Sequence, residues 1–271
     1  MKLRDKVVVV TGSTRGIGRA IAEACAREGA QVVISSRHEV AVQQASEAMS
    51  SLGLKVSGIA ADVSVQTDLE RLLRHALDRW GKVDVWINNA GISGGFRPLD
   101  EMSPEEIDAI VSTNLTATLQ ACRLLIPYFV QRGGGILINM SGKGGRADPS
   151  PHLTTYAATK AAVTSLTKSL AMENSSHPIS IHAVLPGMVA TDFYSDVDAS
   201  PKLTETARSI PYVLKAVGMP IDLVAQLFVE IAAQQPGKET GKVYSLFKGW
   251  RLARGIGLLL WYRVTGKIKG A

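Results

Sequence analysis

The sequence predicts an α/β domain in which a doubly wound parallel sheet carries helices on both faces. Short runs of apolar, β-branched residues alternate along the chain with segments of helical periodicity, and this alternation is typical of parallel sheets whose strands are joined by helices. A glycine-rich turn directly follows the first of these runs. At 271 residues, the chain is long enough for one large domain with a sizeable core.

The first strand is expected at Val7–Val10, a run typical of a strand buried on both faces. The turn Thr11–Gly18 and a helix over Arg19–Glu28 follow it. Glycines in such a turn let the backbone approach a pyrophosphate, whose charge then lies at the helix N-terminus. This succession of strand, turn and helix therefore predicts a dinucleotide site.

The end of the second strand, Gln31–Ser35, indicates which dinucleotide is bound. An acidic residue often binds the adenosine ribose hydroxyls at this position, but here Ser36 and Arg37 follow the strand, and Arg15 lies in the glycine turn. Two guanidinium groups at this corner suit a 2′-phosphate, so the sequence favours NADP(H) over NAD(H). The alternative is that both arginines are solvated surface charges.

The remaining elements follow from the same patterns. Ser103, Pro104 and Glu106 form a strong helix start, and the long helix that follows is expected to end near Pro127. Residues 192–217 are expected to be irregular to helical. Further strands are expected at Lys55–Ala60, Val83–Ile87, Ile136–Met140, Ile179–Leu185 and Lys242–Ser245, and further helices at Glu39–Ser51, Gln66–Trp80, 155–173 and Ile221–Ala233.

Polar residues follow several of these strands. Asp62 is placed to contact an adenine amino group or to cap the next helix at Ser64, and Asn88–Gly91 either lines a cofactor cleft or forms a plain turn. Because parallel strands bring their carboxyl ends to one edge of a sheet, we expect Asn88–Gly91, Ser141 and Pro186–Thr191 to lie with the glycine turn along one cleft.

Tyr156 and Lys160 are spaced by four residues at the start of a predicted helix, which places the phenol and the ammonium one turn apart on one face. A nearby cation favours the phenolate, so this tyrosine can exchange a proton near neutral pH. Such a pair, taken alone, is more often ordinary helix surface. Asn114, inside the preceding long helix, marks either a kink with a bound water or a surface position.

The net charge of +6 is concentrated at the C-terminal end. Residues 248–271 contain six basic and no acidic residues, and the other 24 basic residues equal the 24 acidic residues in number. A body near neutrality argues against a nucleic-acid partner. The tail has an apolar, aromatic centre that suits an anionic membrane surface, but Gly255 and Gly257 weaken any helix there, so we favour an arm packed over the substrate mouth or a subunit interface.

Other features exclude further classes of protein. We expect no signal peptide, because the N-terminus leads directly into a strand, and no membrane span, because no run of about 18 apolar residues appears. Cys25 and Cys122 fit buried thiols in a reducing compartment, and no residues cluster as metal ligands. We therefore expect a cytoplasmic protein, with peripheral membrane association through the tail as a further expectation.

Four motifs in this order resemble the short-chain dehydrogenase/reductase family. Thr11–Gly18 is similar to its TGxxxGxG turn, Asn88–Gly91 to its NNAG segment, Tyr156–Lys160 to its YxxxK motif, and Pro186–Thr191 to the segment that follows its sixth strand. The resemblance covers about residues 5–246. It implies a single Rossmann-like catalytic domain over residues 1–247, with a substrate lid at about 190–218 and an extension at 248–271.

The resemblance implies an oxidoreductase that interconverts a carbonyl and an alcohol by hydride transfer. Tyr156 would be the general acid/base, Lys160 would lower its pKa and bind the nicotinamide ribose, Asn114 would anchor a water, and Ser141 would bond the substrate oxygen. The residues expected to bind NADP(H) are Gly12, Ser13, Arg15, Gly16, Ile17, Gly18, Ser36, Arg37, Asp62, Val63, Asn89, Ala90, Gly91, Tyr156, Lys160, Pro186, Gly187, Val189 and Thr191.

One position departs from the family pattern. The family places two serines at the end of the strand before the tyrosine, whereas this chain has Ser141 and Gly142. Either Ser141 turns into the site or Ser150 or Thr154 replaces the missing hydroxyl. A catalytically silent NADP-binding sensor or scaffold at a membrane, or an epimerase or dehydratase on the same fold, remain alternatives.

The resemblance also indicates partners. The expected substrate is a small carbonyl or alcohol, and apolar Phe193, Tyr194, Tyr212 and Val213 point to a lipophilic one. A homodimer or homotetramer is expected through the helices near 104–127 and 155–173.

Overall fold

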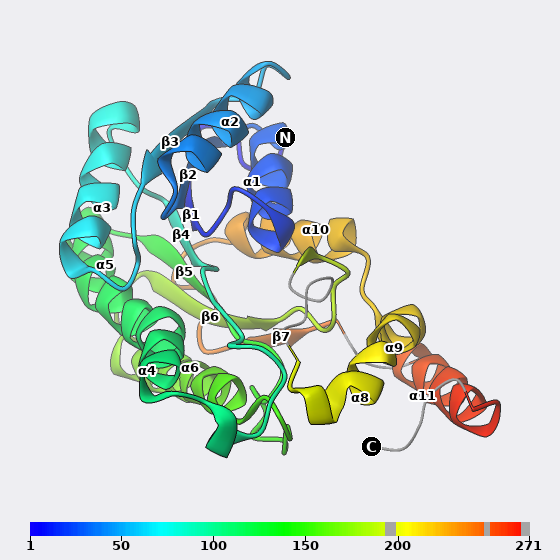
Figure 1. The fold of residues 1–271 in the computed structure, drawn as a ribbon. Coiled ribbons are helices and arrows are strands. Elements are labelled where there is room, and N and C mark those ends of the chain that lie inside the picture. Colours follow the sequence, from blue (N-terminus) through cyan, green and yellow to red (C-terminus); the bar gives the residue numbers. More distant parts are fainter. Residues whose placement is uncertain (193–198, 247–249, 267–271) are drawn as a thin grey trace.

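The computed structural model describes residues 1–192, 199–246 and 250–266 and contains one seven-stranded parallel sheet in the order β3-β2-β1-β4-β5-β6-β7 (Figure 1). The order reverses between β1 and β4, as in doubly wound folds, which confirms the predicted fold class. The strands are β1 (Val7–Thr11), β2 (Gln31–Ser36), β3 (Val56–Ala60), β4 (Val85–Asn88), β5 (Gly135–Met140), β6 (Ile179–Leu185) and β7 (Val243–Ser245).

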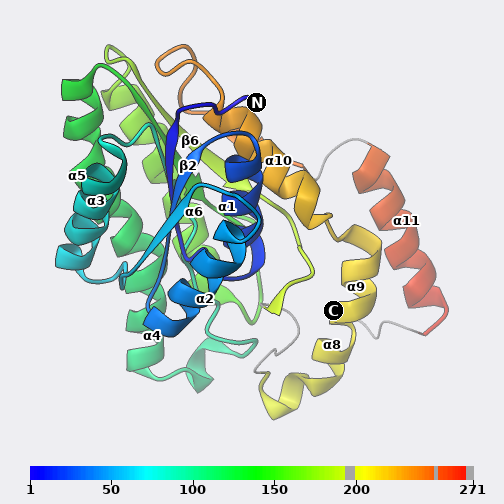
Figure 2. The same ribbon diagram turned by 90° about the horizontal axis from the view of Figure 1, so that it is seen from above.

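Helices cover both faces of this sheet (Figures 1 and 2). One face packs against α1 (Gly16–Arg27), α2 (Glu39–Ser50) and α10 (Ile221–Ala232), and the other against α3 (Gln66–Trp80), α5 (Ala117–Arg132) and α6 (Thr154–Glu173). Within β1, Val8 and Val10 point into the first core and Val9 into the second. The unbroken valine run is thus the sequence signature of a strand buried on both sides.

The long helix starts as predicted but ends later. Ser103 and Glu106 form a capping box at the start of α4 (Pro104–Val111), and the helix continues through a π-helical turn at Ser112–Thr116 into α5. The predicted end near Pro127 is wrong, because α5 runs on to Arg132. Proline removes one helical hydrogen bond, but the buried Phe129 packs this last turn onto the core. By length and composition, the stretch 104–132 could cross a membrane. In this structure its buried side chains lie in the core of the fold.

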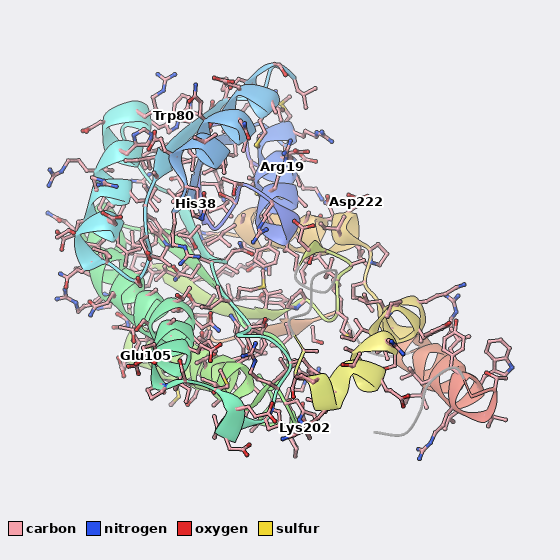
Figure 3. All side chains as sticks on the ribbon, in the orientation of Figure 1. Arg19, His38, Trp80, Glu105, Lys202 and Asp222 are labelled. Carbon is pink, nitrogen blue, oxygen red and sulfur yellow. The ribbon has the colours of Figure 1, made fainter. Side chains whose placement is uncertain are left out.

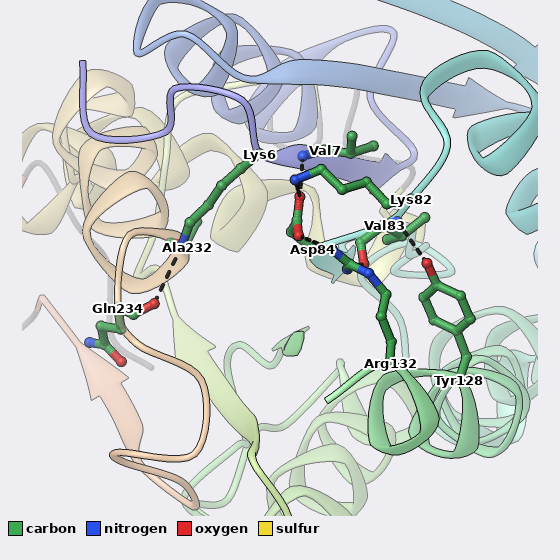
Figure 4. A network of polar contacts seen from close by, with 9 residues as sticks. All are labelled: Lys6, Val7, Lys82, Val83, Asp84, Tyr128, Arg132, Ala232 and Gln234. Atoms are coloured by element: carbon green, nitrogen blue, oxygen red, sulfur yellow. Dashed lines mark hydrogen bonds and ion pairs between the residues drawn. The ribbon is translucent and has the colours of Figure 1, made fainter. Parts of the chain in front are cut away.

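A polar network fixes the amino ends of β1 and β4, at the edge of the sheet opposite the strand ends that were expected to form the cleft (Figure 4). Asp84 accepts hydrogen bonds from the Val7 amide at 2.7 Å and the Arg132 guanidinium at 2.7 Å, and pairs with Lys82 at 3.0 Å. Burial raises the pKa of Asp84, but the bonds from Val7, Arg132 and Lys82 outweigh it and hold the pKa below its ordinary value. The Val83 amide donates to the Tyr128 hydroxyl at 2.9 Å.

Two C-terminal segments lie beside the sheet. A short 3-10 turn at Pro201–Leu203 and the helices α8 (Thr204–Arg208) and α9 (Ile210–Val217) occupy part of the expected lid, while Phe193 and Tyr194 lie outside the described residues. The tail forms α11 (Trp250–Val264), which lies against α9 (Figures 1 and 2). Gly255 and Gly257 were expected to weaken any helix here, yet the helix forms, since packing on α9 outweighs the roughly 1 kcal/mol that each glycine costs in a helix.

Candidate active site

A cleft of about 1130 Å³ lies at the carboxyl ends of the strands. It brings together residues from each segment that was expected along one edge, namely the glycine turn, Asn88–Gly91, Ser141 and Pro186–Thr191. Residues at the ends of β2 and β3, Tyr156 and Lys160 line the same cleft. Among the predicted site residues, Ser13 and Asn114 are the two that do not line it; the others do, and they are Gly12, Arg15, Gly16, Ile17, Gly18, Ser36, Arg37, Asp62, Val63, Asn89, Ala90, Gly91, Ser141, Tyr156, Lys160, Pro186, Gly187, Val189 and Thr191.

The glycine turn depends on the absence of side chains. Gly12 has φ +61°, and a Cβ there would lie 2.8 Å from the Ala90 Cα. A Cβ on Gly18 would lie 2.3 Å from the Gly12 carbonyl oxygen. Ser13 is buried, and its hydroxyl donates to the Val10 carbonyl at 2.6 Å and accepts from the Ser35 amide at 3.1 Å. Its side chain therefore ties β1 to β2 and is directed away from the cofactor position expected for it.

Asn89 braces the turn from the neighbouring strand. Its side-chain amide donates to the Thr11 carbonyl at 2.8 Å and the Gly12 carbonyl at 3.0 Å. The Thr11 hydroxyl in return accepts from the Asn89 amide at 3.0 Å and the Ala90 amide at 3.1 Å. These reciprocal bonds hold the glycine turn and Asn89–Gly91 in one fixed arrangement.

The turn ends at a helix start that can receive an anion. α1 begins at Gly16 without a side-chain cap from its N-cap residue, Arg15, so its first amide groups keep the donor character that binds phosphate. Together with the close backbone approach at Gly12 and Gly18, this donor set fits a dinucleotide pyrophosphate.

The two arginines that were expected to meet a 2′-phosphate both lie at the cleft. Arg15 and Arg37 both line the cleft and are exposed. Arg15 lies 3.8 Å from the Asp192 carboxylate, an exposed pair that contributes little to stability. His38, which directly precedes α2 (Figure 3), also lines the cleft.

Asp62 lines the cleft, so its contact with an adenine amino group stays a prediction. Its carboxylate accepts hydrogen bonds from the Ser64 amide at 2.9 Å and the Ser64 hydroxyl at 2.6 Å. α3 begins at Gln66, and its N-cap residue is Val65 without a side-chain cap, so Asp62 bonds within the turn before the helix and the expectation that it caps this helix at Ser64 is wrong.

Tyr156 and Lys160 lie together on the first turns of α6. The Lys160 ammonium lies 5.5 Å from the centroid of the Tyr156 ring and donates to the Met140 carbonyl at 3.0 Å. The lysine side chain is 3% exposed, and burial lowers its pKa to about 8. A cation in this dry position favours an anionic neighbour, which is the environment that the spacing of the two residues predicted.

Asn114 is buried inside the π-helical turn, so a surface position is wrong and a local distortion of the helix is confirmed. Its side chain accepts from the Ile92 amide at 2.9 Å and donates to the Ile92 carbonyl at 2.9 Å and the Thr159 hydroxyl at 3.2 Å. A Cβ on Gly91 would lie 3.1 Å from the Asn114 side-chain oxygen and 3.4 Å from the Lys160 ammonium. Asn114 and Lys160 therefore meet at Gly91, which must be small.

The hydroxyl of Ser141 does not point toward the phenol. It donates to the Lys160 carbonyl at 3.0 Å and lies 2.8 Å from the Thr164 hydroxyl, in a buried position. The structure instead places Gly142 beside the phenol, since a Cβ there would lie 2.7 Å from the Tyr156 hydroxyl. The expectation that Ser141 bonds the substrate oxygen is thus corrected: its hydroxyl ties β5 to α6.

The proposed replacements also lie outside the lining of the cleft. Ser150 and Thr154 do not line it, and they border a second, smaller hollow of about 350 Å³. The Ser150 hydroxyl donates to the Asp148 carbonyl at 3.2 Å. The position beside Tyr156 is therefore formed by Gly142.

Several cleft residues carried no signal that sequence reasoning detected. Thr14 lies inside the recognised glycine turn, and Ile256 and Leu259 lie in the tail, whose helical spacing was discounted because of its glycines. The others are Ala41, Ala61, Ile92, Ser93, Gly94, Thr113, Lys143, Gly144, Arg146, Asp148, Leu185, Met188, Val217 and Ser245. In the described part of the chain, no three His, Cys, Asp or Glu side chains gather as they would around a metal ion.

The chain is similar to known proteins over most of its length. A family model described as short chain dehydrogenase matches residues 6–202. A protein named 3beta-hydroxysteroid dehydrogenase 1 from Eggerthella lenta is 35% identical over 262 residues, covering 93% of this chain and 98% of that protein. A sorbitol dehydrogenase from Cereibacter sphaeroides is 36% identical over 200 residues, covering 73% of this chain and 76% of that protein.

Solved structures show the same fold. A 3-ketoacyl-(acyl-carrier-protein) reductase from Brucella melitensis, complexed with NADH, superposes with a TM-score of 0.78 at 30% identity, covering 90% of this chain and 97% of that one. The actinorhodin polyketide ketoreductase with NADPH superposes with a TM-score of 0.78 at 27% identity, covering 91% and 97%.

Proposed function

The chain belongs to the short-chain dehydrogenase family and is an oxidoreductase of that family, and we propose that it uses NADP(H) to interconvert a lipophilic carbonyl and the corresponding alcohol. The observation that carries this proposal is the meeting of Tyr156 and Lys160 with the braced glycine turn in one cleft. A dinucleotide position and a proton-exchanging phenol in the same cleft suit redox chemistry at a carbonyl.

The chain's own residues supply binding and proton transfer. The N-terminus of α1 and the glycine turn would hold the pyrophosphate, Asp62 would bind the adenine and Lys160 the nicotinamide ribose. NADPH, when bound, supplies the hydride. Tyr156 donates a proton to the substrate oxygen in reduction and takes it back in oxidation.

Lys160 tunes this proton exchange. Its ammonium is buried and its pKa is lowered to about 8, so it is mostly charged at neutral pH, where it stabilises the phenolate of Tyr156. Asn114 bonds the backbone amide and carbonyl of Ile92. These bonds fix the position of the adjacent Gly91, beside which the Lys160 ammonium lies.

The preference for NADP(H) rests on Arg15 and Arg37. Both line the cleft, Arg37 directly after the end of β2, where no acidic residue follows the strand, and Arg15 in the glycine turn. Guanidinium groups bind phosphate through charge-assisted bonds, and each such bond contributes about 1.5–3 kcal/mol. Of the two structural neighbours, one is described with NADH and the other with NADPH, so the arginines of this chain carry the proposal.

The lipophilic substrate is proposed from the wall opposite the glycine turn. Val213 and Val217 of α9 and Ile256 and Leu259 of α11 line the cleft there. The Eggerthella lenta relative, which covers nearly the whole chain, carries the name of an enzyme for a hydroxysteroid. A hydrophobic ketone or secondary alcohol fits both observations.

One observation favours a second candidate, a catalytically silent NADP-binding protein. No side-chain hydroxyl stands at residue 142 beside Tyr156, and that of Ser141 is engaged inside the fold. A sensor needs the dinucleotide position without a second donor to the substrate oxygen.

Cofactor titration followed by turnover distinguishes the two. Binding of NADPH and NADH is measured by fluorescence, and oxidation of the preferred cofactor is then followed against a panel of lipophilic ketones and aldehydes. Tighter binding of NADPH with turnover of one carbonyl supports the enzyme. Tight binding without turnover across the panel supports the silent protein, and equal binding of the two cofactors contradicts the role of the arginines.

A further inference from the structure

The C-terminal helix α11 forms an outer edge of the molecule. It lies on the far side of α9 from the sheet in both views (Figures 1 and 2). Tyr262 is buried in this contact, with its ring packed edge-on against Tyr212 at a centroid distance of 5.6 Å. One side of α11 is thus anchored, and many of its side chains project away from the body (Figure 3).

The outward side of α11 is apolar. Ile256, Leu260, Trp261 and Val264 are 48%, 57%, 52% and 86% exposed. Their spacing of four, five and eight residues from Ile256 places them on one stripe of the helix. Large apolar side chains gathered on one exposed stripe mark an interaction surface more often than scattered ones do.

Cations border this stripe. At about 100° per residue, Arg263 falls at one margin and Arg254 at the other, and both are exposed. α9, on which α11 packs, carries the exposed Lys215 and no acidic residue. Over residues 248–271 the sequence contains six basic residues and no acidic one, so the charge of this edge complements an anionic surface.

We propose that α11 docks the protein on an anionic lipid bilayer. An apolar stripe with tryptophan at its side and arginines at both margins is the arrangement of helices that lie in the plane of a membrane interface. The aliphatic stems of arginine reach along the apolar stripe while the guanidinium groups meet lipid phosphates. Each cation near such a surface raises the binding constant about fivefold.

The same helix borders the cleft. Ile256 and Leu259 line it together with Val213 and Val217 of α9, so the docked face and the mouth of the cleft share one helix. This step rests on the proposed function: a lipophilic carbonyl or alcohol dissolved in the bilayer would enter beside α11 without crossing water.

Vesicle flotation of the full chain tests the docking without reference to turnover. The protein is mixed with vesicles of phosphatidylcholine alone, or with equal parts of phosphatidylcholine and phosphatidylglycerol. We expect flotation with the anionic vesicles only, weakened by added salt because charge attraction is screened. Flotation equal with both vesicles, or with neither, overturns the proposal.

Paired variants separate the two contributions. Leu260→Ser with Val264→Ser removes apolar contact and lowers anionic binding at least about tenfold, and Arg254→Gln with Arg263→Gln lowers it about 25-fold. The matched controls are Val40→Ser with Leu52→Ser, which are similarly exposed apolar residues elsewhere, and Arg74→Gln with Arg123→Gln, which are exposed arginines elsewhere. Equal losses in controls and α11 variants overturn the assignment to α11.

Two further readouts keep the outcome unambiguous. NADPH binding and turnover of a water-soluble ketone are expected to be unchanged in the Leu260 and Val264 variant, since neither residue lines the cleft. If light scattering shows that this variant instead converts a dimer into a monomer, the stripe joins two copies of the chain and the membrane proposal is wrong. Absent turnover in all variants with intact flotation contradicts the proposed function alone.

Discussion

Replacing Lys160 with methionine is expected to stabilise the cofactor-free protein while abolishing turnover. The ammonium is held in a dry position where its pKa is lowered from 10.5 to about 8, and that displacement corresponds to about 3 kcal/mol of unfavourable free energy. Methionine keeps the length of the side chain without the charge. The lost hydrogen bond to the Met140 carbonyl offsets about 1 kcal/mol, which leaves a net gain of about 2 kcal/mol.

This gain depends on pH in a defined direction. Below about pH 8 both the folded and the unfolded protein hold the Lys160 proton, so wild type bears the full cost. Between pH 8 and 10.5 the folded protein has released the proton and the unfolded protein retains it, so the stability of wild type rises relative to the variant. The advantage of Lys160→Met is therefore largest at neutral pH and shrinks in alkaline solution.

Urea unfolding at about pH 7 and about pH 10 measures this difference directly. Lys168→Met is the matched control, because Lys168 lies on the same helix and is exposed, and it is expected to change the unfolding free energy little at either pH. A Lys160→Met variant that is less stable than wild type at neutral pH, or whose advantage is the same at both pH values, refutes the reasoning. Turnover is assayed on the same samples.

Three further variants test other parts of the site and the core. Arg37→Asp is expected to weaken NADPH binding about a hundredfold with little effect on NADH, and equal loss of both in fluorescence titration contradicts the phosphate role. Gly142→Ala places a methyl group 2.7 Å from the Tyr156 hydroxyl and should lower turnover about tenfold to a hundredfold with cofactor binding unchanged; full turnover would show that the phenol adapts freely. His182 is buried against Tyr244 with neither ring nitrogen hydrogen-bonded in the described structure, and burial lowers its pKa from 6.5 to about 4. Wild type should therefore lose up to about 3 kcal/mol as pH falls from 6.5 to 4, and His182→Phe should remove that loss in acid unfolding.

The fold was predictable because its signals are local and repeated. Val7–Val10 alternates between two cores within one strand, and the capping box at Ser103 sets a helix start by itself. Because parallel strands share one carboxyl edge, locating the strands also located the cleft.

What the sequence did not predict depends on tertiary packing. Pro127 does not end α5 because Phe129 is buried beyond it, and α11 forms despite Gly255 and Gly257 because Tyr262 is buried against α9. Intrinsic helix propensity predicts helix ends and helix formation poorly where one face of the helix packs against another part of the fold.

Local sequence patterns also did not predict the direction in which side chains point at the strand ends. Ser141 and Gly142 are adjacent, and one residue of difference decides which of them faces the phenol. Ser13 lies in the glycine turn but bonds Val10 and Ser35, and only the neighbouring strand reveals this. The position of Asn114 depends on one extra residue in a π-helical turn, which hydrophobic periodicity does not register.

The most direct test of the account is Tyr156→Phe, with Tyr128→Phe as the control that removes a phenolic hydroxyl at the opposite edge of the sheet. NADPH affinity and turnover of a reactive ketone are measured on both variants and on wild type. We expect Tyr156→Phe to bind NADPH as wild type does and to lose turnover at least about a hundredfold, while Tyr128→Phe keeps both. Turnover at the wild-type rate in Tyr156→Phe would contradict the assignment of this phenol as the proton donor.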